Sequence, residues 1–518
     1  MPALHILYAF RYTFFMAFEW MTSGFQWVGG GTLGESHFII ARWIFLRAMG
    51  VIYLIAFLSL WVQIRGLIGS HGILPVQDFL DAVREHVGPD RFRLLPTIFW
   101  VSASDAALHI VCGLGVLSAL LLIFNVLPLA SAIVLWALYL SLFNVGQDFL
   151  SFQWDTLLLE TGFLTIFLVP WGILPGLGVA LSPLIILLFW WLLFRFMFES
   201  GVVKLTSGDT SWRDLTALTY HYFTQPLPTW TAWYMHQMPA AFHKFSTLFT
   251  YGIELALPFL IFTSRIPRLI ACIGFVLLQI IIFSTGNYNF FNLLTVALSL
   301  LLIDDRMWVQ VLPQRLVEWI SPIAATEILP QWFAGIISVI AIVIILVSGF
   351  QLLRTLARGV PMPRFIEVLE TWIDPFRSVH SYGLFRVMTK TRPEIIIEGS
   401  SDGEHWKSYE FRWKPGDPTR RPAFIEPHQP RLDWQMWFAA LGNFRTTPWF
   451  HSLLFGLLKG SDEIHGLLKE NPFPSNPPKF IRAVLYEYTF TDMKERKATG
   501  AWWKRTYKGL YAPALSLR

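Results

Sequence analysis

Apolar runs separated by polar loops dominate the first two thirds of the chain. A helix that crosses a lipid bilayer needs about 20 mostly apolar residues. Nine runs approach that length, at 43–62, 103–124, 126–143, 155–170, 181–200, 245–263, 266–284, 290–304 and 332–353. The pattern predicts a polytopic α-helical membrane bundle of about eight or nine spans over residues 41–355.

The stretch before the first run has a different character. Arg11 and Glu19 interrupt its apolar residues, and three glycines follow at 29–31 without the small-residue pattern of a cleavage site. We therefore interpret residues 1–40 as an interfacial lead-in to the bundle and not as a cleavable signal.

After about residue 375 the spacing of apolar positions changes. Residues 382–389, 394–399, 406–413 and 480–490 are strand-like, and Ser-Asp-Gly at 401–403 is a hairpin turn signal. Helical patterns lie between them at 431–441, 448–459 and 461–470. Residues 375–518 are predicted to form a C-terminal, β-rich soluble domain, β-sandwich-like with helical insertions.

Composition supports a membrane protein. Hydrophobic residues make up 54% of the 518 positions and charged residues only 14%, whereas soluble domains are nearer a quarter charged. The basic residues flank the apolar runs instead of forming one stripe, which argues against nucleic acid as a partner. Cys112 and Cys272 lie in apolar runs, so a disulfide framework or redox pair is excluded.

Basic residues in short loops predict the orientation. The loop at 264–268 and the connection containing Arg306 and Arg315 carry the clearest positive bias, which places both in the cytoplasm. The C-terminal domain then lies outside, on the same face as the loops at 63–102, 144–154, 201–244 and 285–289. The membrane would be the endoplasmic reticulum of a eukaryote or the plasma (inner) membrane of a bacterium, and the sequence leaves both open.

Ionisable residues inside apolar runs need partners, because an unpaired charge is costly in hydrocarbon. Glu160 and Arg195 have opposite signs on neighbouring antiparallel runs, so we predict an intramembrane ion pair. Lys204 has two interpretations: an interfacial lysine paired with Glu199 or Asp209, or a desolvated amine with a lowered pKa that acts as a base.

Polar and aromatic loop residues are candidates for binding a client peptide or a ligand. Amides fix the orientation of a ligand and aromatic rings stack on it, so these residues could ring a pocket near Lys204. The alternative interpretation is that they cap loops by satisfying backbone groups. The candidates in the loops are His71, Gln147, Asp148, Gln153, Trp154, Asp155, Trp212, Asn287 and Asn289.

The C-terminal domain contributes three more candidates. Trp434 belongs to an aromatic face at helical spacing, which predicts core packing first and a client-binding patch second. The turn that contains His428 and Arg431 is the more exposed contact in this interpretation. No histidine pair has HxxxH or HExxH spacing, and no GxSxG elbow or phosphate-cradling glycine loop occurs, so we predict no metal site and no hydrolase.

Several long motifs resemble the lipase maturation factor family. They lie at 42–47, 66–75, 153–160 (with Gln-Trp-Asp at its start), 212–218 and 286–292 (with Asn-Tyr-Asn), and at 427–438 in the C-terminal domain. The resemblance implies a membrane protein of the endoplasmic reticulum that helps secreted lipases fold and assemble, with its C-terminal domain in the lumen, engaging the client.

A fainter similarity concerns residues 201–205, Gly-Val-Val-Lys-Leu, which resemble a segment of the vitamin K-dependent γ-carboxylases. There the residue matching Lys204 acts as a base, although Val203 replaces a neighbouring lysine of that segment. Two functions follow. The first is a chaperone-like maturation factor that has secreted clients such as lipases, contacts membrane lipid and uses no cofactor. The second is an intramembrane enzyme with Lys204 as base and a quinone-like lipid as cofactor.

Overall fold

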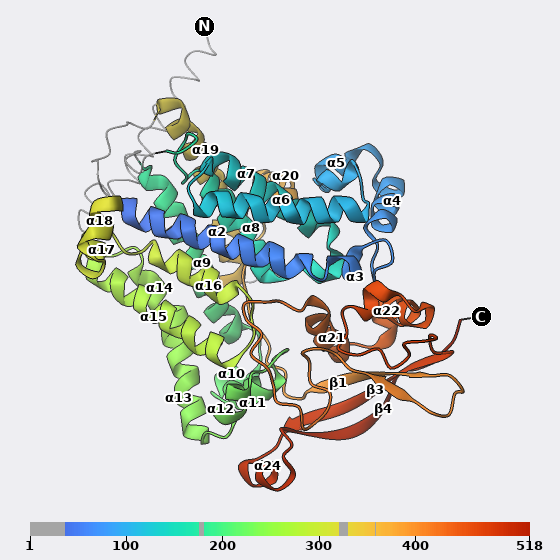
Figure 1. The fold of residues 1–518 in the computed structure, drawn as a ribbon. Coiled ribbons are helices and arrows are strands. Elements are labelled where there is room, and N and C mark those ends of the chain that lie inside the picture. Colours follow the sequence, from blue (N-terminus) through green and yellow to red (C-terminus); the bar gives the residue numbers. More distant parts are fainter. Residues whose placement is uncertain (1–36, 176–180, 321–329, 358, 518) are drawn as a thin grey trace.

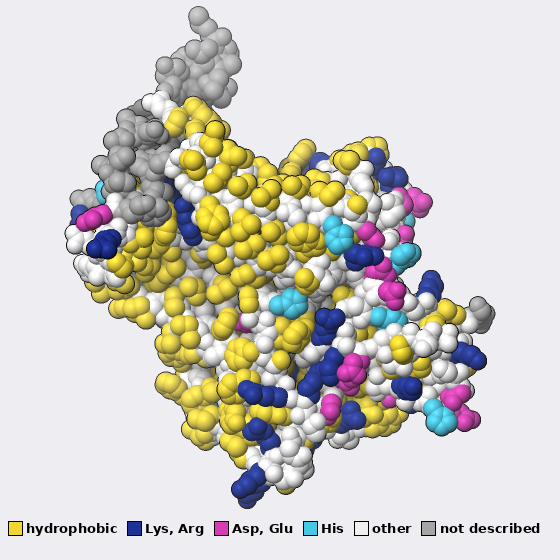
Figure 2. Space-filling model, viewed as in Figure 1, with side chains coloured by type: hydrophobic (Ala, Val, Ile, Leu, Met, Phe, Trp, Pro, Cys, Tyr) yellow, Lys and Arg dark blue, Asp and Glu magenta, His cyan; other side chains and the backbone are white. Residues whose placement is uncertain are grey.

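The computed structural model describes residues 37–175, 181–320, 330–357 and 359–517, and the predicted lead-in at 1–40 lies almost entirely outside these ranges. A helical bundle forms one part of the molecule, and a smaller domain built on a β-sheet packs against one end of it (Figure 1). Figure 2 shows apolar side chains covering the bundle, while charged side chains gather over the C-terminal domain and over the opposite end of the bundle.

Six described helices are long and apolar enough to cross a membrane. Their lengths match the bilayer core, since each residue of an α-helix rises about 1.5 Å and the core is about 30 Å thick. Prolines lie in the first turns of α7 and α9 and favour helix starts there. The Ser104 side chain caps the start of α6 by accepting a hydrogen bond from Ala107 N. The six are α2 Ile39–Trp61, α6 Asp105–Ile123, α7 Pro128–Val145, α9 Pro183–Thr206, α15 Arg265–Thr285 and α19 Gln331–Leu356.

The other three predicted runs are helical but shorter or interrupted. α8 covers Gln153–Ile166 and α16 covers Phe291–Leu300. The run at 245–263 is divided into α13 Ala240–Tyr251, the π-helix η4 Gly252–Ala256 and α14 Leu257–Leu260. Pro258 cannot donate a backbone hydrogen bond, which is one reason why the regular helix does not continue through this region.

Short helices fill the loops at both ends of the bundle. At the end where the C-terminal domain packs they are α3 Ile64–Ile68, α4 Val76–Val87, η1 Gly88–Asp90, α5 Arg91–Leu94, η2 Ile98–Trp100, η3 Gln147–Leu150, α10 Thr210–Arg213, α11 Ala217–Thr224 and α12 Trp230–His236. At the other end are α17 Asp305–Val311 and α18 Gln314–Ile320. α20 Arg364–Ile373 and η5 Asp374–Phe376 follow the last span.

The C-terminal domain contains one antiparallel sheet among the described residues, in the order β2-β1-β3-β4. Its strands are β1 Pro393–Ser400, β2 Lys407–Tyr409, β3 Phe480–Phe490 and β4 Trp503–Leu515, and Ile397 of β1 lies between Tyr409 and Ala483. The helices of this domain are α21 Arg431–Leu441, η6 Phe444–Thr446, α22 Pro448–Lys459, α23 Asp462–His465 and α24 Met493–Thr499.

The predicted β-sandwich is therefore corrected to one sheet with helices packed against it. α21 contacts β1 and α22 contacts β3, and both helices bury apolar side chains, so they take the place that a second sheet would fill. Residues 382–389, predicted as a strand, form no strand, because their backbone groups bond to side chains of the bundle.

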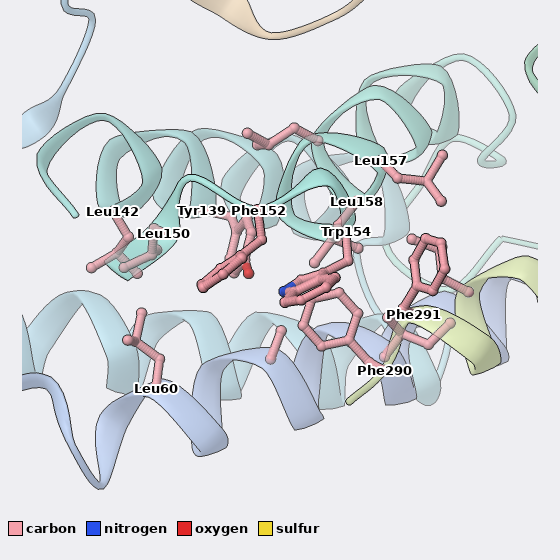
Figure 3. Packing of buried hydrophobic residues seen from close by; sticks show 14 of the residues in the cluster. Leu60, Tyr139, Leu142, Leu150, Phe152, Trp154, Leu157, Leu158, Phe290 and Phe291 are labelled. Atoms are coloured by element: carbon pink, nitrogen blue, oxygen red, sulfur yellow. The ribbon is translucent and has the colours of Figure 1, made fainter. Parts of the chain in front are cut away.

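One hydrophobic core continues from the bundle into the C-terminal domain. Figure 3 shows part of it, where the Trp154 ring projects from the start of α8 toward Phe290 and Phe291. Phe149 beside α8 also meets Trp449 of α22, with ring centroids 5.8 Å apart. The two parts are thus joined by apolar packing as well as by the chain.

Candidate functional site

A cavity of about 300 Å³ lies at the junction of the bundle and the C-terminal domain. Its walls come from the segment before and at the start of α8, from α11, from the loop at 286–289 and α16, from residues 383–389 and from α21. Of the predicted binding residues, Gln153, Trp154 and Trp434 line it.

Aromatic rings form most of the cavity wall. Phe152 stacks on Trp154 at 4.6 Å between centroids, and Trp154 meets Trp434 edge to face at 4.7 Å. Tyr288 packs edge to face on both Trp434 and Phe385, at 5.8 Å and 5.7 Å. Such pairs prefer these offset and perpendicular arrangements, so the rings hold one another in place.

Several of the polar side chains that line the cavity already have hydrogen-bond partners. Gln225 accepts a hydrogen bond from the Tyr288 hydroxyl at 2.8 Å, and Gln153 accepts one from Gly383 N at 3.3 Å. Burial, with Lys204 nearby, lowers the pKa of His221 to about 4, so its imidazole is neutral at physiological pH. This chemistry suits an apolar or aromatic guest held by an occasional hydrogen bond.

A buried ion pair fastens the C-terminal domain beside the cavity. Arg431 at the start of α21 contacts both carboxylate oxygens of Asp155 on α8, at 2.8 and 2.9 Å. Tyr139 donates to the same carboxylate at 2.6 Å, and Arg431 also donates to the Phe149 carbonyl at 2.6 Å. All of these groups are buried. Asp155 and Arg431 are therefore part of the domain junction.

This geometry corrects the prediction that the turn containing His428 and Arg431 is an exposed contact. The His428 Nδ1 atom lies 2.9 Å from the Ser59 hydroxyl of α2, and Gln63, between α2 and α3, accepts from Arg431 N at 3.0 Å. The turn docks on the end of α2, because its polar backbone groups find partners there instead of in water.

A second clamp was not predicted from the sequence. The buried Arg392 guanidinium donates to the carbonyls of Phe223 and Pro226 at 2.8 Å each, and to Gln225 O. Glu394 balances its charge at 2.7 Å. The residues around Arg392 in the sequence are those expected beside an exposed arginine at the start of a strand. Only the tertiary structure shows that Arg392 is buried and joins the two parts of the molecule.

The loop at 286–289 supplies a third junction. Asn287 donates to the carbonyls of Leu227 and Ala423, and its own carbonyl accepts from Ile425 N at 2.8 Å. Glu426 accepts a hydrogen bond from Tyr288 N, and burial raises the pKa of the Glu426 carboxyl to about 8. Asn287 thus bridges the two parts of the molecule and does not face the cavity.

A non-helical segment of the chain, residues 378–389, enters the bundle between α8 and α9. The Tyr382 hydroxyl donates to Glu160 at 2.6 Å, and Tyr382 N donates to Glu199 at 2.6 Å. Arg195 donates to the His380 carbonyl at 2.7 Å and also to Glu160. Irregular backbone at this depth is tolerated only where protein covers it, as here. The Glu160 and Arg195 pair therefore also anchors this inserted segment.

Lys204 has a partner other than those predicted. Its amine lies 2.6 and 2.7 Å from the two carboxylate oxygens of Glu254 and donates to Ser200 O at 3.1 Å. Glu199 is five residues away on the same helix, so it faces another direction, since only residues three or four apart are neighbours. Asp209 instead accepts from Met388 N at 2.7 Å.

The remaining predicted residues have structural contacts. Trp212 donates to Phe385 O at 3.0 Å, and Gln147 donates to Leu74 O at 3.2 Å. The Asn289 side chain accepts from Phe291 N, the first residue of α16, at 3.1 Å. His71 and Asp148 are exposed, and their carbonyls accept from Ser461 and Gln435 respectively.

Two family models match the chain. The model of the lipase maturation factor transmembrane domain covers residues 40–310, and that of the C-terminal domain of the same factors covers residues 378–513. The chain belongs to the lipase maturation factor family. The first match covers the bundle as far as α17, and the second covers the domain that clamps onto it.

Vertebrate relatives match over nearly the whole chain. Lipase maturation factor 2 of Gallus gallus is 36% identical, over 92% of this chain and 81% of its own length. Lipase maturation factor 2 of Homo sapiens is 36% identical over 92% and 83%, and lipase maturation factor 1 of Bos taurus is 37% identical over 92% and 89%. No solved structure matches the chain.

Proposed function

We propose that this protein is a membrane-anchored maturation factor for secreted lipases, and that the immature client binds at the cavity between the bundle and the C-terminal domain. The names of the relatives support the class of function. The single observation that carries the choice of site is the aromatic cavity, whose walls come from both family domains.

The rim of the cavity suits contact with an incompletely folded protein. Val387 and Phe438 line it and remain 63% and 45% exposed. A volume of about 300 Å³ is at the small end of ligand pockets, which suits one or two large client side chains. Aromatic anchors in such pockets provide most of the binding free energy at protein interfaces.

We further place the C-terminal domain on the non-cytoplasmic side of the membrane, where a secreted client passes. The basic connections at 264–268 and 304–315 meet at the end of the bundle opposite this domain, where Arg265 and Arg268 both contact Asp304. A reporter fused to the C-terminus should read as external. A cytoplasmic signal would reject both the orientation and direct contact with a secreted client.

Phe438→Ala should reduce client binding and secretion. The variant removes a half-exposed ring from the rim, and loss of an aromatic anchor costs about 1–2 kcal/mol, or roughly 5- to 30-fold in affinity. Secretion of an active co-expressed lipase and co-purification of the client are the measurements, at matched levels of the membrane protein.

Leu441→Ala is the matched control. Leu441 lies on the same helix with a similar exposure of 43%, but it does not line the cavity. Equal secretion by the two variants would remove the cavity from the proposal.

The enzyme alternative has no supporting observation among the described residues, because the Lys204 amine is paired with Glu254 and does not line the cavity.

A further inference from the structure

A second, larger cavity of about 750 Å³ lies on the other side of the inserted segment. The ends of α9 and α19, the helix α20 and residues 381–386 enclose it, and its lining is mostly polar. Gln153, Gly383 and Arg386 line both cavities. The two cavities therefore share a wall but differ in chemistry.

Two arginines give this cavity a positive side. Arg354 and Arg386 line it, and no carboxylate of the described residues lies within ion-pair distance of either guanidinium. Both side chains are exposed. Arg195 and Arg431, by contrast, each have a carboxylate partner. These two guanidinium groups are thus available to an anion.

One carboxylate, Glu370 of α20, faces the same cavity. One of its oxygens accepts a hydrogen bond from Gln351 at 2.7 Å. The charged lining of the cavity therefore combines two cationic groups with one anionic group. A ligand that carries both a phosphate and an amine would satisfy all three.

The cavity lies where the bundle meets the surface of the membrane. Arg354 is in the last turn of the spanning helix α19. Leucines at the ends of α9 and α19 are exposed. They are Leu353 and Leu356 on α19 and Leu205 on α9, each 40–47% exposed.

The helix α20 has the character of a helix that lies in the membrane plane. Ile366 is buried against the protein, whereas Phe365, Val368 and Trp372 form an exposed apolar stripe at spacings of three and four residues. Arg93 lies over the Trp372 ring at 5.3 Å. Such a helix rests at the boundary between acyl chains and headgroups, which sets the depth of the adjacent cavity.

We propose that this cavity binds the headgroup of a membrane glycerophospholipid. Arg354 and Arg386 bind the phosphodiester, because guanidinium groups match phosphate oxygens in charge and geometry. Glu370 faces the ammonium of a zwitterionic headgroup, so phosphatidylethanolamine is preferred over phosphatidylglycerol. The acyl chains lie along the exposed leucines of α9 and α19.

The test uses the full-length protein in detergent and in nanodiscs of defined composition. Lipids that remain bound after purification are identified by native mass spectrometry, and binding is measured by exchange of a labelled phosphatidylethanolamine. The R354Q/R386Q variant is expected to lose at least tenfold in affinity, since it removes two charged hydrogen-bonded contacts to the phosphate.

Arg364→Gln is the matched control, because Arg364 is an exposed arginine at the start of α20 that does not line the cavity. It should retain wild-type lipid. Equal retention by R354Q/R386Q and R364Q, with unchanged melting temperatures, would overturn the proposal. The experiment measures lipid retention and does not involve a client. A negative result would therefore reject the lipid site without bearing on the proposed maturation function.

Two further arms distinguish the source and the kind of phosphate. Inorganic phosphate and glycerophosphoethanolamine should fail to displace the labelled lipid at millimolar concentration, because they lack acyl chains. Displacement by either compound would show that the cavity binds a soluble phosphate and would overturn the proposal of a lipid site. Glu370→Gln should reduce the preference for phosphatidylethanolamine over phosphatidylglycerol. An unchanged preference would reject the role of Glu370.

Discussion

Arg431→Ala is expected to release the C-terminal domain from the bundle. The substitution leaves Asp155 buried beside Tyr139 without its cationic partner, and breaking a buried ion pair in this way costs about 3–5 kcal/mol. Thermal unfolding in detergent and limited proteolysis between the two parts should both show the loss. Secretion of the client should fall with it, because the aromatic cavity needs both parts.

Two control variants distinguish the effect of an unpaired charge from a loss of packing at this junction. Arg431→Met combined with Asp155→Leu removes both charges and should recover much of the lost stability, since no unpaired charge remains. Arg445→Ala, at an exposed position of the same domain, should change stability by less than about 0.5 kcal/mol. A melting temperature for Arg431→Ala equal to that of Arg445→Ala would contradict the ion pair as the fastening.

The second large effect is expected at the inserted segment. Arg195→Ala leaves Glu160 unpaired inside the bundle and removes the donor to His380 O, so we expect a loss of about 3–5 kcal/mol. Tyr382→Phe removes one hydroxyl and keeps the ring, and should cost about 1–3 kcal/mol. The measurement is the unfolding of purified protein in one detergent.

Comparison with a double variant decides whether the charges act as a pair. Glu160→Leu with Arg195→Met should be more stable than either single charge-removing variant. If the double variant loses the sum of the single losses, the two residues stabilise the bundle independently. Protection of residues 378–389 from proteolysis would show at the same time whether the segment stays inserted.

Much of the fold follows from the spacing of apolar residues. The sequence predicts the bounds of α21, α22 and β3 as the structure has them, because each has a complete helical or alternating pattern between turn signals. All nine apolar runs are helical in the structure. The run at 290–304 is already short in the sequence, but the pattern did not reveal that α8 and α16 end before their runs do, since apolar turns extend both runs.

The site was less accessible to sequence reasoning. Gln153 and Trp154, predicted to lie beside a pocket, line the cavity, because aromatic and amide residues on loops of one face tend to converge. Trp434, predicted first to pack in the core, lines it as well. That these residues bind a client stays a prediction. The partnership of Lys204 with Glu254, the Arg392 clamp and the insertion of residues 378–389 depend on segments far apart in the chain. Composition and spacing describe local structure, and these contacts are not local.

The inserted segment also has a consequence for how the protein is made. Tyr382 completes the surroundings of Glu160 from a position 222 residues later in the chain. During synthesis, helices α8 and α9 therefore enter the bilayer before the groups that cover their charged residues exist. The bundle reaches its final form only when most of the polypeptide has left the ribosome, and until then these helices carry buried charges that lack some of their final partners.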